Sequence, residues 1–394
     1  MSAAPPDPAE ILTGPGVVVV KVGSSPLAAP GADPEPGRVL DRIVDVLVAR
    51  AAVGPDRRAV VVSSGAVAAG LGPLGLPRRP ADLAGLQAAA SVGQPAVLAR
   101  WTASFARHGV PVGQVLFDLD DLVRRDHYVN ARATLRRLLT LGAVPVVNEN
   151  DAVATDELRY GDNDRLGAVV AHLVGARALV LLTDVDALYD RPPSRPGARR
   201  IPWVPDPWRV EAEIGAAGSA VGSGGMRTKV VAARMAAAAG VPTLVTAAAA
   251  VARAFGGEDV GSWFGADPAP APARTLWLAH VAAPRGVLRL DAGAVAAVVR
   301  RGASLLPAGI TAVDGVFAVG DVVELRDPAD RPVARGIVGY SAAELPPLLG
   351  RSTHDLRAEL GSAYAREIVH RDDLVVEPGR RSGAPERHLG QPAG

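Results

Sequence analysis

The first 260 residues alternate short apolar runs rich in β-branched side chains with longer segments whose apolar residues recur at helical spacing. The short runs predict strands of a buried parallel sheet at residues 17–22, 59–63, 110–117, 144–147, 178–183 and 243–246. The longer segments predict helices at residues 39–47, 86–105, 131–141 and 230–239, with Asn130 as an N-cap. This alternation predicts a three-layer α/β/α domain around a mostly parallel sheet, over residues 15–262.

The pattern changes after a Pro/Ala-rich segment at residues 263–274, which predicts a stiff linker. Short alternating runs at residues 286–290, 315–319 and 321–325 then predict a small β-barrel-like domain over residues 275–373. The polar, Pro- and Gly-rich ends, residues 1–14 and 374–394, predict disorder.

Composition excludes several classes of protein. The absence of cysteine excludes disulfides, thiolate zinc sites and cysteine nucleophiles, and the seven histidines lack metal-ligand spacing, so we expect no metal site built by the protein alone. A net charge of +1 gives no whole-chain reason to expect nucleic acid or an anionic membrane as a partner. The N-terminus lacks the features of a signal peptide, and no apolar stretch approaches the roughly 20 residues of a membrane span. We therefore expect a cytoplasmic enzyme or binding protein.

Lysine is almost absent from this chain. Only Lys21 and Lys229 stand among 42 basic residues, and both lie beside glycines in segments that resemble loops at element ends. A GC-rich coding bias explains why lysine is rare but not where the two lysines lie. A compact ammonium can approach a phosphate as a point charge, which a planar guanidinium cannot do.

Polar motifs follow the first two predicted strands. Lys21-Val-Gly-Ser-Ser offers backbone N–H groups and one positive charge to an anion, although a lysine after a strand is common. Ser63-Ser-Gly-Ala suits an anion or carboxylate at a helix N-terminus, and an ordinary serine N-cap explains it equally well. The serine-hydrolase pattern Gly-x-Ser-x-Gly does not match, because Val62 stands where its first glycine would be.

Amide and carboxylate side chains follow the later strands. Asn148-Glu-Asn-Asp151 and Gly161-Asp-Asn-Asp164 could hold an amino group, orient a lysine or face Mg²⁺, or could be solvated turns. Thr183-Asp184 could meet a nucleotide or its metal.

The glycine-rich segment at residues 222–229 ends in Lys229 and precedes a predicted helix. It matches neither a Walker A loop nor Gly-x-Gly-x-x-Gly, yet glycines, a threonine and a lysine at a helix start suit a phosphate, and a flexible linker is the alternative. Because parallel strands end at one edge of a sheet, we expect these motifs to gather there. Lysines, serines and amides without a Cys–His or Ser–His pair favour phosphoryl transfer over hydrolysis through a covalent enzyme intermediate.

Taken in order, these motifs closely resemble the bacterial glutamate kinases of the amino acid kinase family. Residues 301–310 and 320–323 resemble the PUA domain that many of these kinases carry, and the resemblance extends over residues 17–373. It implies ATP- and Mg²⁺-dependent phosphorylation of the γ-carboxylate of L-glutamate to L-glutamyl 5-phosphate, the first step of proline biosynthesis. It also implies feedback inhibition by proline, a homo-oligomer and functional coupling to glutamyl-phosphate reductase.

The resemblance assigns roles residue by residue. It implies that Lys21 and Lys229 are catalytic and that Asp164 orients them. It implies glutamate binding by Ser64, Asp151 and Asn163. It implies nucleotide binding by Lys21, Thr183, Asp184, Ser223, Gly224, Gly225, Met226, Arg227, Thr228 and Lys229. The chain departs from the family pattern at Pro26, at Ser223 and in the Pro/Arg-rich stretch 191–200, where nucleotide affinity and regulation could differ.

Two other interpretations remain open from the sequence. Kinases acting on acetylglutamate, aspartate or a nucleoside monophosphate would share the fold and both lysines. An RNA-binding protein is the second alternative, because PUA domains elsewhere bind RNA. Residues 275–372 hold 11 arginines and 11 acidic residues, whereas RNA binding usually leaves a basic footprint, so we do not expect nucleic acid as a partner.

Overall fold

A computed structural model describes residues 7–27, 35–117, 125–153, 162–191, 193–210, 225–267, 284–361, 364 and 366–376. The chain forms two compact units, which divide between Ala273 and Arg274. Each unit has its own sheet and its own hydrophobic core, and each is described by itself.

The first unit is built on an eight-stranded sheet with the strand order β3-β4-β2-β1-β5-β7-β8-β6. Its strands are β1 Gly16–Val22, β2 Arg57–Val62, β3 Val112–Phe117, β4 Val144–Glu149, β5 Ala178–Thr183, β6 Trp203–Val204, β7 Thr243–Ala247 and β8 Ser262–Phe264. All neighbouring strands are parallel except β7 and β8, which are antiparallel. The prediction of a mostly parallel sheet is confirmed.

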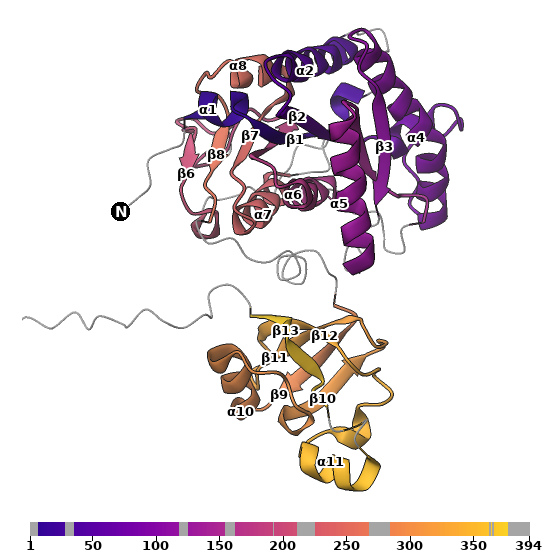
Figure 1. Ribbon diagram of the computed structural model, residues 1–394, viewed down its shortest axis with the longest axis vertical. Coiled ribbons are helices and arrows are strands. Elements are labelled where there is room, and N and C mark those ends of the chain that lie inside the picture. The colour runs from indigo at the N-terminus through magenta and orange to yellow at the C-terminus, as the bar shows by residue number, and fades with distance from the viewer. Residues whose placement is uncertain are drawn as a thin grey trace, which may run out of the picture. The chain divides into compact units, whose positions relative to one another are not determined.

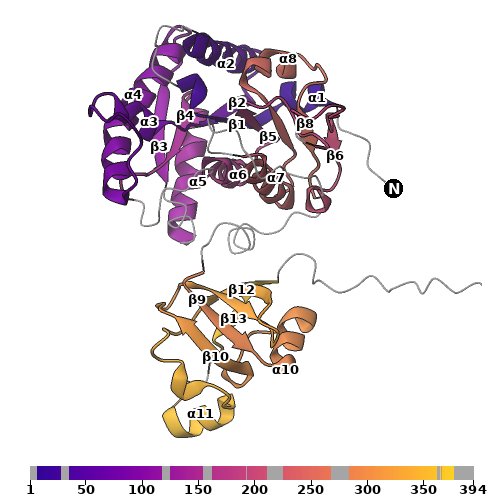
Figure 2. The same cartoon turned by 180° about the vertical axis from the view of Figure 1, so that it is seen from behind.

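Helices cover both faces of this sheet (Figures 1 and 2). The helices are α1 Pro8–Thr13, α2 Glu35–Ala52, α3 Ala66–Leu71, α4 Leu83–Ala106, α5 Arg125–Thr140, α6 Asp162–Val174, α7 Met226–Ala238 and α8 Val251–Phe255. Helices α2 and α8 lie on one face, and α5, α6 and α7 lie on the other (Figure 1). The unit therefore has the predicted three layers.

Side chains along β1 point alternately to the two faces of the sheet. Val18, Val20 and Val22 are fully buried in one core cluster, together with apolar residues of α2, α4 and α8. Because successive strand side chains point to opposite faces, Val19 and Lys21 lie on the face covered by α6 and α7. The first lysine is thereby directed toward the two helices that carry Asp164 and Lys229.

Three expectations for this unit need correction. Helix α5 is already formed at Arg125, so Asn130 is an exposed residue inside the helix and not its N-cap. Strand β8 includes Trp263 and Phe264, so the sheet extends past the predicted boundary at residue 262. Residues 8–13 form α1 and are not disordered, because Leu12 is fully buried in the core. The expectation for residues 1–6 lies outside the described residues.

Buried Arg50 anchors the segment that joins α1 to β1. Its Nε donates to the Leu12 carbonyl at 2.6 Å, and its Nη1 donates to the Arg58 carbonyl at 2.9 Å. Its Nη2 lies 2.9 and 2.8 Å from the carbonyls of Gly14 and Gly16. Burial, followed by the charges of two neighbouring arginines, lowers the pKa of Arg50 to about 10. Four carbonyl acceptors compensate for the cost of burying this charge.

We expect Arg50→Lys to lower the free energy of unfolding by about 2–3 kcal/mol, because an ammonium cannot reach carbonyls that a guanidinium fork spans and leaves several of them unpaired. Chemical denaturation of the variant and of the unmodified protein measures this loss. Arg57→Lys is the matched control, since the Arg57 side chain donates one hydrogen bond among the described residues, from Nε to the Thr13 carbonyl at 2.7 Å, and the variant should lose less than about 1 kcal/mol. Equal losses in the two variants would contradict the anchoring role of Arg50.

The second unit is a five-stranded sheet with the strand order β10-β9-β11-β12-β13. Its elements are β9 Gly286–Leu290, α10 Ala292–Val295, β10 Ile310–Gly315, β11 Val322–Arg326, β12 Pro332–Val338, α11 Thr353–Leu360 and β13 Val369–Val376. Strands β9 and β11 are parallel, and the other neighbours are antiparallel. The expectation of a small, mainly β second domain is consistent with this sheet.

Two expectations for the second unit also change. The run at 315–319 is not a strand, because β10 ends at Gly315 and Val316, the next residue, is 91% exposed. Residues 374–376 belong to β13, where they pair with Ala334, Arg335 and Gly336 of β12, so they are not a disordered tail. The remainder of that predicted tail lies outside the described residues. No helix in the described ranges combines the length and the apolarity that a membrane crossing requires.

Candidate active site

Four parallel strands of the first unit end at the same edge of the sheet. In β1, Lys21 lies in register with Val62 of β2 and Leu181 of β5. Directly after β2, the Ser63 N–H donates to the Val147 carbonyl of β4 at 2.8 Å. The polar motifs that follow these strands therefore converge at one edge, as predicted.

Asp164 joins the two lysines of the chain. Its Oδ1 lies 2.8 Å from Lys21 Nζ, and its Oδ2 lies 3.4 Å from Lys229 Nζ. Asp164 is fully buried, and the lysines are 7% and 3% exposed. Three charged groups from β1, α6 and α7 thus share one buried position, although the two lysines are 208 positions apart in the sequence. We call these three residues the Lys–Asp–Lys cluster.

The charges within the cluster act against the effect that burial has on the pKa values of Asp164 and Lys229. Burial alone would raise the pKa of Asp164, but Lys21, Lys229 and a hydrogen bond from Thr228 outweigh it and hold that pKa below its ordinary value. Burial lowers the pKa of Lys229, and the charge of Lys21 lowers it further, while Asp164 and the exposed Asp184 act to raise it. The two ammonium groups therefore repel each other appreciably, and Asp164 holds them together.

The start of α7 completes the cluster. Gly225 is the N-cap residue of α7, and Lys229 lies in its first turns. Thr228 Oγ1 lies 2.9 Å from both Asp164 Oδ2 and the Gly225 carbonyl, either of which can accept its hydrogen bond. The hydroxyl of Thr228 therefore supports Asp164, a contact that the sequence did not predict.

A second group of residues lies at the ends of β2 and β4. After Ser64, Gly65 has φ 94°, a left-handed conformation that favours glycine, and it is the N-cap residue of α3. Trp101 of α4 donates from Nε1 to Ser63 Oγ at 3.0 Å. Helix α4 thus supports the loop that carries Ser64.

Two buried amide oxygens lack hydrogen-bond partners among the described residues. They are Oδ1 of Asn148, at the end of β4, and Oδ1 of Asn163, in the first turn of α6. A buried acceptor without a donor costs about 1–3 kcal/mol. Asn148 and Asn163 are therefore positioned to accept hydrogen bonds from a bound molecule.

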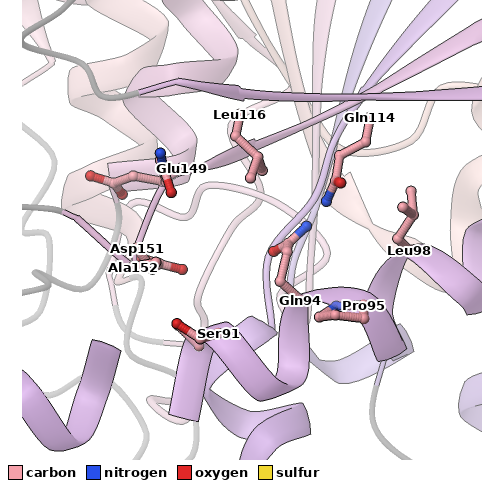
Figure 3. Close-up of a pocket in the computed structure, with 11 residues that line it drawn as sticks. Ser91, Gln94, Pro95, Leu98, Gln114, Leu116, Glu149, Asp151 and Ala152 are labelled. Carbon is pink, nitrogen blue, oxygen red and sulfur yellow. The ribbon is translucent and has the colours of Figure 1, made fainter. Parts of the chain in front are cut away.

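Asp151 lines a cavity of about 320 Å³ between α4, β3 and the loop after β4 (Figure 3). Ser91 and Gln94 of α4 form one side of it, and Gln114 and Leu116 of β3 form another (Figure 3). The three residues predicted to bind glutamate lie in different segments at this edge. Ser64 follows β2, Asp151 follows β4, and Asn163 lies in the first turn of α6.

The predicted nucleotide-binding residues are only partly described. Thr183, half-buried, ends β5, and the exposed Asp184 follows it. Met226 and the exposed Arg227 begin α7, whereas Ser223 and Gly224 lie outside the described residues. Of the departures noted in the sequence, Pro26 lies in a short 3₁₀ turn, and Arg200 of the Pro/Arg-rich stretch pairs with Asp259.

The donor set at this edge fits a polyanion better than a free metal ion. Within the ranges that the structure describes, no group of three or more histidine, aspartate or glutamate side chains is arranged to hold a metal. The Lys–Asp–Lys cluster instead offers two ammonium groups, which suit phosphate oxygens. Magnesium commonly binds together with substrate phosphates and keeps several waters, so these residues are compatible with magnesium that is bound to a nucleotide.

Comparison with known proteins decides the family. Residues 16–259, more than half of the chain, match the amino acid kinase family. The chain belongs to the amino acid kinase family. Residues 286–360, which lie in the second unit, match the PUA domain. The resemblance drawn from the sequence motifs is confirmed for both domains.

Relatives match the amino acid kinase and PUA domains together. The chain is 58% identical over 361 residues to the glutamate 5-kinase of Streptomyces coelicolor, which covers 91% of this chain and 96% of that protein. It is 56% identical over 361 residues to the glutamate 5-kinase of Salinispora arenicola, and this match covers 91% of this chain and 97% of that protein. Among solved structures, a carbamate kinase from Giardia lamblia bound to AMP-PNP is similar at 15% identity and a TM-score of 0.47, covering 65% of this chain and 100% of that chain.

Proposed function

We propose that this amino acid kinase transfers the γ-phosphoryl group of ATP to the γ-carboxylate of L-glutamate, which yields L-glutamyl 5-phosphate and ADP. The observation that carries the proposal is the buried Lys–Asp–Lys cluster at the strand edge. Two ammonium groups held beside one carboxylate suit the transfer of a phosphoryl group between two anions. The relatives that are 53–58% identical across both domains support glutamate as the acceptor.

The chemistry needs charge compensation more than proton transfer. A glutamate γ-carboxyl has a reference pKa of about 4.3, so it is already ionised at neutral pH and needs no general base. The barrier arises because this anion must approach the anionic phosphates of ATP. Lys21 and Lys229 reduce that repulsion in the transition state, when charge spreads over the equatorial and bridging oxygens. Magnesium bound to the nucleotide supplies further positive charge.

The remaining roles divide along the strand edge. We propose that Ser64, Asp151 and Asn163 bind glutamate, because each follows or lies beside the end of a central strand. We propose that Thr183, Asp184 and the 223–229 segment bind ATP, because Thr183 leaves β5 on the same face as Lys21 by the alternation of the strand. Asp164 then orients both lysines from α6.

Other properties of the proposal rest on the family resemblance. They are feedback inhibition by proline, assembly into a homo-oligomer, a cytoplasmic location and functional coupling to glutamyl-phosphate reductase. Acetylglutamate, aspartate and RNA are not favoured as alternatives, because the two relatives described above are named as glutamate 5-kinases.

The purified protein should form an acyl phosphate from L-glutamate that hydroxylamine traps as a hydroxamate, and the yield should depend on both ATP and Mg²⁺. Aspartate and acetylglutamate at equal concentration serve as acceptor controls, and omission of ATP is the blank. A hydroxamate signal from either control acceptor, with none from L-glutamate, would reject glutamate as the substrate.

A further inference from the structure

Helix α4 directs a glutamine toward the end of β4. Gln94 Oε1 accepts a hydrogen bond from Asn148 Nδ2 at 2.6 Å. Asn148 is 1% exposed and follows the buried Val147, so its carboxamide lies inside the protein at the strand edge. The contact joins residues that are 54 positions apart in the chain.

This hydrogen bond determines which atom Asn148 has available for a ligand. With its Nδ2 donating to Gln94, the opposite atom is Oδ1, which is buried and has no hydrogen-bond partner among the described residues. The buried Oδ1 of Asn163 also has no hydrogen-bond partner among the described residues. Acceptors of this kind match the α-ammonium group of an amino acid, which carries three N–H donors.

The two amide groups are linked in orientation. Gln94 Nε2 is also buried and without a hydrogen-bond partner in the described part of the chain. If Asn148 turned its amide over, its Oδ1 would face Gln94 and its Nδ2 would face the ligand, and Gln94 would have to turn as well. The two amides therefore turn only together, and the observed hydrogen bond is the arrangement in which Asn148 offers an acceptor.

Close helix packing keeps Gln94 in place. A Cβ atom at the neighbouring Gly93 would lie 1.8 Å from the Ala66 carbonyl oxygen of α3, and one at Gly70 would lie 1.9 Å from that of Ala89. Helices α3 and α4 thus meet backbone to backbone, on glycines that admit no side chain. Gln94 projects from this fixed helix into the cavity that Asp151 also lines (Figure 3).

We propose that Gln94 is a positioning residue of the amino acid subsite, which holds Asn148 so that its Oδ1 accepts a hydrogen bond from the α-ammonium of the substrate. The inference rests on the proposed function, since it needs an amino acid acceptor. It assigns no chemical step to Gln94, which acts only through Asn148.

The test is a double-mutant cycle with Gln94→Met, Asn148→Ala and the double variant. Methionine is close to glutamine in volume but cannot fix the asparagine amide. Gln94→Met should raise the KM for glutamate about tenfold, while kcat and the KM for ATP stay within about twofold, which corresponds to the loss of one hydrogen bond. The double variant should have the glutamate KM of Asn148→Ala alone, because residues that act as one unit are not additive.

Gln87→Met is the matched control. Gln87 belongs to the same helix α4 but does not line the cavity, so this variant should keep the glutamate KM of the unmodified enzyme. The upward shift of the thermal midpoint that glutamate produces gives a second readout without turnover, and it should shrink in Gln94→Met but not in Gln87→Met.

Three results would overturn the inference: an unchanged glutamate KM in Gln94→Met, additive effects in the double variant, or an equal effect of Gln87→Met. A parallel loss of kcat and of ATP affinity would likewise overturn it, because that pattern indicates a general structural role. Failure of the proposed function is a separate outcome, recognised when the unmodified enzyme yields no acyl phosphate from glutamate.

Discussion

Replacing either Lys21 or Lys229 by arginine is expected to lower kcat by about 10²- to 10³-fold, although each variant keeps its positive charge. Both side chains are almost completely buried, and both contact Asp164. The planar guanidinium is larger than an ammonium and presents its donors in a fixed fork, so it cannot occupy the same point beside a phosphoryl group. Turnover in the hydroxamate assay, measured at saturating glutamate and ATP, gives the result.

Arg253→Lys provides the control for basic substitutions. Arg253 pairs with Glu258 on the surface of the first unit, far more exposed than either lysine, and the change should leave kcat unaltered. Circular dichroism and thermal unfolding establish that each arginine variant is folded. Near-normal turnover in a folded Lys21→Arg or Lys229→Arg variant would mean that a point charge is not required at that position.

The pH dependence of turnover provides an independent check on Lys229. Burial, followed by the charge of Lys21, lowers its pKa below the ordinary 10.5, and Asp164 offsets this only in part. Raising the pH therefore removes the ammonium proton earlier than in an exposed lysine, so kcat should fall on the alkaline side below pH 10.5. The residual turnover of Lys229→Arg should lack that decline, because arginine stays protonated.

Replacing Asp164 by asparagine is expected to destabilise the first unit by about 3–5 kcal/mol and to abolish most turnover. The amide has the size of the carboxylate and can still accept from Thr228, but it leaves Lys21 and Lys229 buried beside each other without the charge that holds them together. Denaturant unfolding at neutral pH measures the loss of stability.

The same unfolding measurement at acidic pH distinguishes the loss of the Asp164 charge from a defect in packing. The pKa of Asp164 lies below its ordinary 3.8, so its ionised form stabilises the fold above that pH, and this contribution is lost as the pH falls through the lower, folded-state value. The difference between Asp164→Asn and the unmodified protein should therefore be greatest near neutral pH and shrink in acid. Adding Lys229→Met to Asp164→Asn should restore part of the stability, since it removes one of the two repelling charges. A deficit that neither acid nor the second substitution reduces would point to packing.

Much of the fold follows from local pattern. Runs such as residues 17–20 and 178–182 are apolar along their whole length, and short apolar runs bounded by polar residues are typical of strands covered on both faces. The strand ends could be predicted for the same reason, since polar motifs interrupt the apolar runs there. Helix boundaries follow less closely from local pattern: α5 is already formed at Arg125, because the residues before Asn130 are compatible with a helix.

The sequence by itself thus determined six strands and four helices of the first unit, the edge of the sheet at which the motifs gather, and the resemblance that names Lys21, Asp164 and Lys229. Only the tertiary structure decided how their charges are paired, that Thr228 supports Asp164, and that Gln94 holds Asn148. The spacing of apolar residues indicates whether a residue is buried and which of its near neighbours in sequence share its face. Hydrogen bonds and ion pairs between residues 54 to 143 positions apart depend instead on how helices pack on the sheet, which no local pattern encodes.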